Sequence, residues 1–227
     1  MITTGKSRAN GAVENSCLVC VADVAGKGLD ASLLMSNMQA TLHALLGQFT
    51  SLIELAAKLN SRVFESSPPN KFITAILLEI NPATGDAIYV NAGHTGGILQ
   101  RADGRSESLE STGMALGVMP QEMLVSLGNQ YEERLFSLQT GDILALYSDG
   151  VTEANDEHER QWGEDKLRAC LNAVSSDSAQ AIVAKVLSEV DQFSGSAPQH
   201  DDITLLVLKR AVCGRNDPGK YLQAGRA

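Results

Sequence analysis

Long apolar runs are absent from this 227-residue chain. A helix that crosses a bilayer needs about 20 consecutive apolar residues, so the sequence predicts no membrane span. The opening segment, MITTGKSRANG, carries one lysine and one arginine but lacks the apolar stretch that a secretory signal requires. We therefore expect a cytoplasmic protein.

Positive charge is also scarce, with 18 Lys and Arg against 27 Asp and Glu and a formal net charge of −9. This balance argues against non-specific binding to nucleic acid or to anionic membranes, both of which favour basic surfaces. It still allows a phosphorylated substrate, because a bound cation can reverse the local sign of the potential.

The four cysteines, Cys17, Cys20, Cys170 and Cys213, lack the spacing of a disulfide framework, which favours a reducing compartment. Cys17 and Cys20 have C-x-x-C spacing, but residues three apart on a strand point to opposite faces. No second C-x-x-C or histidine cluster completes a zinc set. We expect neither a zinc site nor a redox motif.

Two familiar motifs are missing as well. At Gly26-Lys27-Gly28, a P-loop would need glycine in place of Val21 and Ser or Thr in place of Gly28. There is no G-x-S-x-G elbow for a serine nucleophile. The glycines are better explained by a sharp turn that follows Asp23.

Apolar residues make up 44% of the chain, a globular composition of a size for one large domain or two small ones. Apolar periodicity and turn residues predict a strand, two helices, a run of antiparallel strands, two more helices and a last strand. This order favours an α+β fold, a four-layer sandwich of two antiparallel sheets flanked by helix pairs. The predicted strands are 17–22, 72–80, 87–91, 96–101, 106–109, 131–138, 143–147 and 203–208, and the helices end near Gly47, Ser66, Val174 and Phe193.

Acidic residues stand at three strand ends: Asp23, Asp149, and the pair Asp201 and Asp202. An Asp beside Gly is often only a turn residue, and we read Asp103 and Asp142 in that way. Carboxylates that converge from several strands can instead hold two hard divalent cations for phosphoryl transfer. The sequence leaves both readings open. The role of His94 has three readings: a metal ligand, a phosphate contact or, by default, a loop histidine whose hydrogen bonds are satisfied within the protein.

A set of motifs in a fixed order carries a resemblance: DVAGKG, FITAILLEI, NAGHTG, MALGV, GDILALYSDGVTEA, WGEDKL and HDDITLLVLK. From Cys17 to Arg210 the chain resembles the PPM-type, metal-dependent serine/threonine protein phosphatases. The similarity is strongest to their bacterial branch, typified by sporulation stage II protein E and by regulators of the stress-response sigma-factor pathway.

The resemblance implies two Mn²⁺ or Mg²⁺ ions and a metal-bridging water that attacks phosphoserine or phosphothreonine directly. It implies metal ligands at Asp23, the Val24 carbonyl, Asp149 and Asp201, with Asp202 the weaker candidate. The expected substrate is a phosphorylated regulatory protein of the anti-sigma-factor-antagonist kind. His94 is a weak candidate for substrate binding.

One departure from the family pattern concerns an acidic motif, Gly-Gly-Asp-Tyr-Tyr-Asp, on a strand before the first motif. Residues 1–16 contain no Asp, so we expect an irregular segment at 1–16, the phosphatase domain at 17–210 and a disordered tail at 211–227. Either the chain is a fragment, with a possible sensor domain upstream, or its metal site is incomplete. An incomplete site favours an alternative function, a phosphatase-like module that binds a partner protein. A phosphoryl hydrolase acting on small molecules is a third reading.

Overall fold

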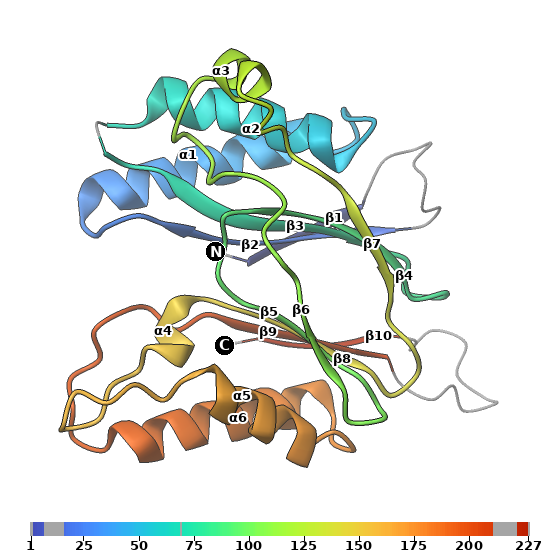
Figure 1. Ribbon diagram of the computed structural model, residues 1–227, viewed down its shortest axis with the longest axis vertical. Helices are drawn as coiled ribbons and strands as arrows, with labels where there is room; N and C mark the ends of the chain where they lie inside the picture. Colours follow the sequence, from blue (N-terminus) through green and yellow to red (C-terminus); the bar gives the residue numbers. More distant parts are fainter. Residues whose placement is uncertain (1, 7–15, 69, 211–221, 227) are drawn as a thin grey trace. The chain divides into compact units, whose positions relative to one another are not determined.

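The structure is a computed structural model that describes residues 2–6, 16–68, 70–210 and 222–226. It divides into two compact units, each built from two stretches of the chain. Unit 1 comprises Met1–His94 and Glu110–Ser137, and unit 2 comprises Thr95–Leu109 and Leu138–Ala227. Each unit holds one antiparallel sheet with a pair of long helices against it (Figure 1). The predicted α+β class is therefore confirmed.

In unit 1 the sheet has the order β1-β2-β3-β4-β7, and every neighbouring pair is antiparallel. Helices α1 and α2 lie on one face of this sheet, and α3 lies beside α2 (Figure 1). The strands of unit 1 are β1 (Ile2–Lys6), β2 (Cys17–Val24), β3 (Ile73–Ile80), β4 (Asp86–Ala92) and β7 (Arg134–Ser137), and its helices are α1 (Leu29–Leu45), α2 (Leu52–Ser66) and α3 (Gln121–Ser126).

In unit 2 the sheet has the order β10-β9-β8-β5-β6, again antiparallel throughout. Helices α5 and α6 pack against one face of it (Figure 1). The strands of unit 2 are β5 (Gly97–Gln100), β6 (Ser106–Ser108), β8 (Ile143–Tyr147), β9 (Leu205–Arg210) and β10 (Leu222–Arg226), and its helices are α4 (Asp149–Thr152), α5 (Glu164–Ala173) and α6 (Ala179–Ser194).

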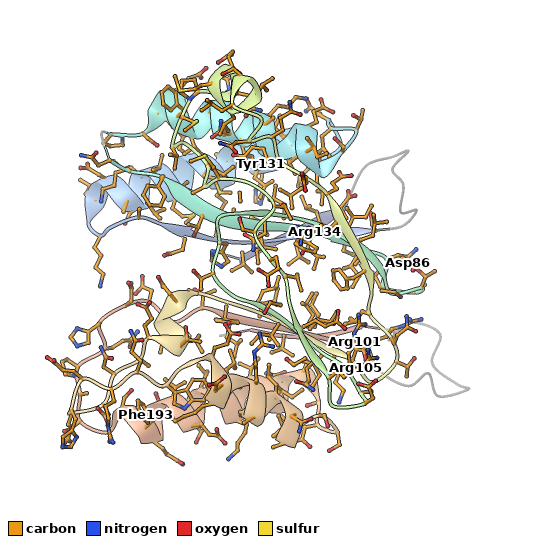
Figure 2. The ribbon with its side chains drawn as sticks, in the orientation of Figure 1. Asp86, Arg101, Arg105, Tyr131, Arg134 and Phe193 are labelled. Atoms are coloured by element: carbon orange, nitrogen blue, oxygen red, sulfur yellow. The ribbon has the colours of Figure 1, made fainter. Side chains whose placement is uncertain are left out.

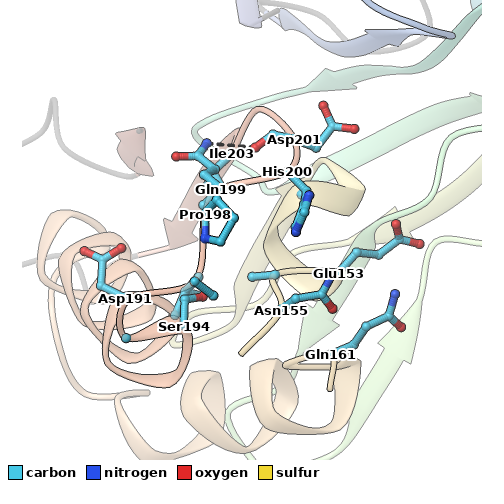
Figure 3. Close-up of a pocket in the computed structure, with 15 residues that line it drawn as sticks. Glu153, Asn155, Gln161, Asp191, Ser194, Pro198, Gln199, His200, Asp201 and Ile203 are labelled. Carbon is cyan, nitrogen blue, oxygen red and sulfur yellow. Dashed lines mark hydrogen bonds between the residues drawn. The ribbon is translucent and has the colours of Figure 1, made fainter. Parts of the chain in front are cut away.

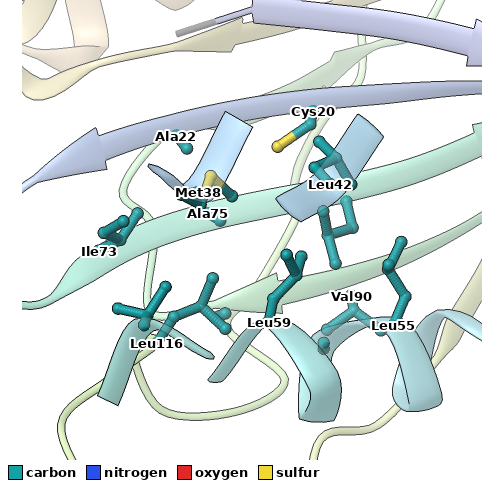
Figure 4. Packing of buried hydrophobic residues seen from close by; sticks show 14 of the residues in the cluster. Cys20, Ala22, Met38, Leu42, Leu55, Leu59, Ile73, Ala75, Val90 and Leu116 are labelled. Carbon is teal, nitrogen blue, oxygen red and sulfur yellow. The ribbon is translucent and has the colours of Figure 1, made fainter. Parts of the chain in front are cut away.

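The core of unit 1 follows from the two-residue period of β2. Every second side chain of this strand is buried against the helix pair, and the residues between them face away. Figure 4 shows how strand and helix side chains interdigitate in this cluster, which includes Cys20, Ala22, Met38, Leu42, Leu55, Leu59, Ala75 and Val90. Asp23 therefore lies on the face of the sheet that the helices leave free.

The same period separates Cys17 from Cys20. Cys20 lies in the helix-facing core, where burial raises the pKa of its thiol to about 12. Cys17 is half-buried and has the other parity along the strand. The two sulfurs therefore belong to opposite faces, as the sequence predicts.

The start of α2 has a capping box with one change from the standard pattern. The Ser51 side chain accepts a hydrogen bond from the Glu54 amide at 3.1 Å, which satisfies one of the free donors of the first turn. The Glu54 carboxylate accepts a hydrogen bond from the Thr50 amide at 2.7 Å, where a standard capping box would use the Ser51 amide.

Both chain ends correct the sequence-based expectation. Ile2–Lys6 forms a strand that pairs along its whole length with β2, so the prediction of an irregular segment is wrong for these residues. Leu222–Arg226 forms a strand paired with β9, so the prediction of a disordered tail is wrong there. The other residues of both predicted segments, apart from Ser16, lie outside the described part of the chain. Pairing with an apolar neighbour strand, rather than local pattern, makes these segments strands.

Short helices were also missed. The sequence analysis predicts no helix at Gln121–Ser126 or at Asp149–Thr152. Two predicted strands have different bounds in the structure. The strand predicted at 131–138 is shortened to Arg134–Ser137, and the last strand, predicted at 203–208, begins at Leu205.

Asp142 and Asp103, both read as turn residues, differ greatly in burial. Asp142 is buried, and its carboxylate accepts hydrogen bonds from the Ala102 amide at 3.0 Å and the Gln139 amide at 2.9 Å. It also pairs with Arg101 at 2.9 Å. Asp103 pairs with Arg105 at the surface of the same turn, where Figure 2 places Arg101 and Arg105 close together.

We predict that Asp142→Ala lowers the free energy of unfolding by about 3 kcal/mol, because it leaves a charge and two amides without their shared partner. Asp103→Ala, the matched control, should leave stability almost unchanged because solvent screens its ion pair. Urea denaturation followed by circular dichroism measures both. Equal destabilisation by the two variants would contradict the structural role of Asp142.

Candidate metal and phosphate site

Asp23 is the second-last residue of β2 in unit 1, opposite Thr74 of β3. The Thr74 hydroxyl lies 2.9 Å from Nδ1 of His94 and 3.5 Å from the Asp23 carbonyl oxygen. These groups share the sheet face that points away from α1 and α2, since directly paired residues point to the same side. Thr74 therefore connects the predicted ligand strand to His94.

His94 is buried and fixed at both of its backbone groups. Its amide donates to Oδ1 of Asn91 at 2.7 Å, and its carbonyl accepts from Nδ2 of Asn91 at 3.0 Å. This geometry suits the default reading of a satisfied loop histidine. A contact between His94 and substrate stays a prediction.

The turn after Asp23 is covered by a lysine that sequence reasoning missed. An ideal Cβ on Gly26, whose φ is +93°, would lie 2.1 Å from Nζ of Lys71. A side chain at residue 26 would displace this ammonium group, and the positive φ also favours glycine there. The Ala25 amide donates to the Phe72 carbonyl at 2.9 Å, which ties the turn to the residue after Lys71. The lysine thus lies beside the turn that follows Asp23 and Val24, and no motif in the sequence predicts it.

In unit 2, Asp149 opens the short helix α4 directly after β8. Its Oδ1 atom is buried and has no hydrogen-bond partner among the described residues. Buried carboxylate oxygens are normally satisfied, so an unpartnered one fits the role of a cation ligand.

Asp201 and Asp202 stand in the loop before β9 and are brought next to α4. An ideal Cβ on Gly150 would lie 2.5 Å from the Asp202 carbonyl oxygen. Oδ1 of Asp201 accepts a hydrogen bond from the Asp202 amide at 2.8 Å, which orients the Asp201 carboxylate.

One hydroxyl group joins these segments. Oγ of Ser148 donates to the Asp202 carbonyl at 2.9 Å and accepts from the Thr204 amide at 2.9 Å. The Ser148 amide in turn donates to the Thr204 carbonyl at 2.9 Å. The end of β8 and the start of β9 are therefore held together at the point where the acidic residues stand.

These residues fit a divalent metal in their chemistry. Asp149, Asp201 and Asp23 offer the carboxylate oxygens that Mn²⁺ and Mg²⁺ prefer, and the unpartnered Oδ1 of Asp149 is the strongest sign of a ligand. Within the described residues, no group of three or more His, Cys, Asp or Glu side chains is already gathered as a metal site. The acids are divided between the units, with Asp23 in unit 1 and the others in unit 2.

The acidic motif expected before DVAGKG is absent from the strand in that position. Strand β1 pairs with β2, and its sequence ITTGK has no carboxylate. The described part of the chain thus has the strand but not the acid.

A pocket of about 340 Å³ adjoins Asp201 and Gly150 in unit 2. Figure 3 shows Glu153, Asn155 and Gln161 across the pocket from Asp191 and Ser194. The lining residues are Gly150, Glu153, Ala154, Asn155, Gln161, Val190, Asp191, Ser194, Gly195, Ala197, Pro198, Gln199, His200, Asp201 and Ile203.

The pocket wall between Asn155 and Gln161 is a closed turn. Asn155 and Gln161 form an isolated bridge, and the Asp156 carboxylate inside the turn accepts from the His158 and Arg160 amides, both at 2.9 Å. The hydrogen-bonded Arg160 guanidinium holds the pKa of Asp156 at about 2. Trp162 follows the turn, buried in the core of unit 2, and its amide donates to the Ala154 carbonyl at 2.9 Å.

Comparison with known structures gives the class of the fold. The SiaA-PP2C domain of Pseudomonas aeruginosa superposes with a TM-score of 0.74 at 17% identity, covering 91% of this chain and 78% of that domain. The RsbU and RsbW domains of Rv1364c from Mycobacterium tuberculosis superpose with a TM-score of 0.68 at 21% identity, covering 99% of this chain and 55% of that chain. The chain has the fold of the PP2C, or PPM-type, phosphatases.

The family model described as Stage II sporulation protein E (SpoIIE) matches residues 14–211, so the chain belongs to this family. The resemblance drawn from the motifs is thereby confirmed. Phosphoserine phosphatase RsbU of Bacillus subtilis is 29% identical over 202 residues, which are 88% of this chain and 57% of RsbU. The chain thus spans little more than half of this relative.

Metal is present in at least two structural neighbours. RsbX was solved in complex with magnesium (TM-score 0.62, 15% identity, covering 91% of this chain and 92% of that chain). The catalytic domain of the phosphatase PstP was solved with two manganese ions (TM-score 0.54, 17% identity, covering 91% of this chain and 95% of that chain). As for membranes, no helix in the described ranges has the length and apolar character to span one.

We predict that Gly150→Ala weakens Mn²⁺ binding by about tenfold or more, because the new methyl group displaces the Asp202 carbonyl and the loop that carries Asp201. Isothermal titration calorimetry measures this affinity.

Gly113→Ala is the matched control, since its Cβ would lie 2.3 Å from the ring of Tyr131 in unit 1. It should lower stability and leave the Mn²⁺ affinity unchanged. Wild-type Mn²⁺ affinity in Gly150→Ala would contradict the placement of the acids.

Proposed function

We propose that this chain is a metal-dependent phosphoprotein phosphatase domain that hydrolyses phosphoserine or phosphothreonine on a regulatory protein. Membership of the SpoIIE family and the similarity to a phosphoserine phosphatase support the reaction class. The observation that carries it is the buried Oδ1 atom of Asp149, which has no partner among the described residues and belongs to a set of acids joined by Ser148.

The proposed ligands are Asp23 and the Val24 carbonyl from unit 1, and Asp149 and Asp201 from unit 2, with Asp202 as the weaker candidate. Two Mn²⁺ or Mg²⁺ ions bound there would supply an activated water nucleophile and neutralise the phosphoryl charge. No side chain of the chain needs to act as nucleophile, which agrees with the absence of a serine or cysteine elbow.

The chain's own residues position the reaction. Asp149 and Asp201 are fixed by α4 and by the Asp202 amide, so they need little reorganisation on binding cations. Lys71, poised over the Gly26 turn, adds a positive charge close to the Asp23 segment. That charge favours a phosphate dianion there, against the net charge of −9.

The regulatory substrate is proposed on the family resemblance, which implies an anti-sigma-factor antagonist carrying a phosphoserine. The activity is proposed for a cytoplasmic setting, and a sensor domain elsewhere in the full protein is compatible with the proposal.

We predict that the chain hydrolyses p-nitrophenyl phosphate and a phosphoserine peptide with Mn²⁺, and that Asp149→Asn lowers kcat/KM by about 100-fold or more, because it removes one charged ligand. Asp103→Asn, an exposed acid in the same unit, should retain full activity. Undiminished turnover in Asp149→Asn, or in the wild type with EDTA, would overturn the mechanism.

A second function, a protein-binding module without turnover, is favoured by one observation: strand β1 has no carboxylate in ITTGK. Mn²⁺ titration of the folded chain separates the two functions. We expect two binding events for the phosphatase. A folded chain that binds no Mn²⁺ would support the module instead.

A further inference from the structure

The pocket beside Asp201 lies wholly within unit 2 and is formed by two segments. One is α4 with the turn that follows it, and the other runs from the end of α6 to the loop before β9. Its volume of about 340 Å³ is at the lower end of the range for ligand pockets. It is large enough for one long side chain of a bound protein.

The pocket is lined by acidic residues, and His200 is the one basic residue type among its lining residues. Its fifteen lining residues, all of them described, include the acids Glu153, Asp191 and Asp201 and no Lys or Arg. The carboxylates of Glu153 and Asp191 form no ion pair with any described residue. Two uncompensated carboxylates across one cavity favour a cationic occupant.

The remaining lining suits the stem and the donors of such an occupant. Val190, Ala197, Pro198 and Ile203 give an apolar wall for methylene groups. Asn155, Gln161 and Ser194 add neutral hydrogen-bond acceptors (Figure 3). Several acceptors at different positions favour the guanidinium group, which carries five donors, over an ammonium group.

The pocket also adjoins the proposed metal ligands of unit 2. Asp201 belongs to both, and Gly150 follows Asp149 directly. An extended peptide advances about 3.3 Å per residue, so a side chain in this pocket belongs to a residue a few positions from the phosphoserine.

We propose that this pocket binds an arginine side chain of the phosphoprotein substrate near its phosphoserine, with lysine as the weaker alternative. The inference rests on the proposed function for its biological substrate. The binding of the arginine group itself does not depend on turnover.

The first experiment is therefore done without metal. The ¹⁵N-labelled chain in EDTA is titrated with blocked arginine, N-acetyl-arginine methylamide, and with blocked citrulline, its neutral isostere. We expect saturable amide shifts at Glu153, Ala197 and Gln199 with arginine only. The double variant Glu153→Gln/Asp191→Asn should lose them.

The matched control is Asp103→Asn/Asp165→Asn, which removes the same charge from exposed acids of unit 2 outside the pocket and should retain the shifts. Equal shifts with citrulline, no shifts with arginine, or shifts that persist in the pocket variant would overturn the proposal.

The second experiment uses phosphoserine peptides that differ only by arginine or citrulline beside the phosphoserine. With the arginine peptide, the pocket variant should raise KM by about tenfold and leave kcat unchanged, because ground-state binding alone is lost. With the citrulline peptide, wild type and variant should have the same KM. Equal KM values of the wild type for the two peptides would overturn the pocket's role in substrate binding. If no peptide is hydrolysed, the proposed function fails and the metal-free titration alone decides on the pocket.

Discussion

The hydroxyl group of Ser148 is the interaction on which the acidic end of unit 2 depends. It follows β8 and makes both of its hydrogen bonds to the loop before β9, donating to the Asp202 carbonyl and accepting from the Thr204 amide, so the end of β8 and the start of β9 are held in one arrangement. Because both bonds are partly shielded from water, breaking them leaves polar backbone groups unsatisfied. Asp149 and Asp201 therefore owe their proximity to backbone contacts, not to attraction between like charges.

The acidic residues of unit 2 lie in two different surroundings. Asp149 has a buried oxygen with no hydrogen-bond partner among the described residues, whereas Glu153 and Asp191 line an open cavity. The buried oxygen favours a metal ion, because a desolvated oxygen suits a compact ion. The open cavity favours an organic cation, because exposed carboxylates suit a hydrated side chain. A phosphorylated substrate with a basic neighbour would satisfy both.

The sequence was informative where local chemistry decides structure. Apolar periodicity predicted β2, β3 and β8, and it placed the end of α2 near Ser66. It failed where distant partners decide: ITTGK becomes a strand only by pairing with β2. Motif order identified Asp149 and Asp201, but Lys71 lies 45 positions after Gly26, and only the fold brings the two together.

Trp162 gives unit 2 an optical property that unit 1 lacks. It is the only tryptophan in the chain, and it is buried in the core of unit 2 directly after the pocket residue Gln161. Indole emission selected by excitation near the red edge of the spectrum will therefore report the state of unit 2 alone, while circular dichroism averages over both units. Loss of the two signals at different denaturant concentrations would reveal that the units unfold separately.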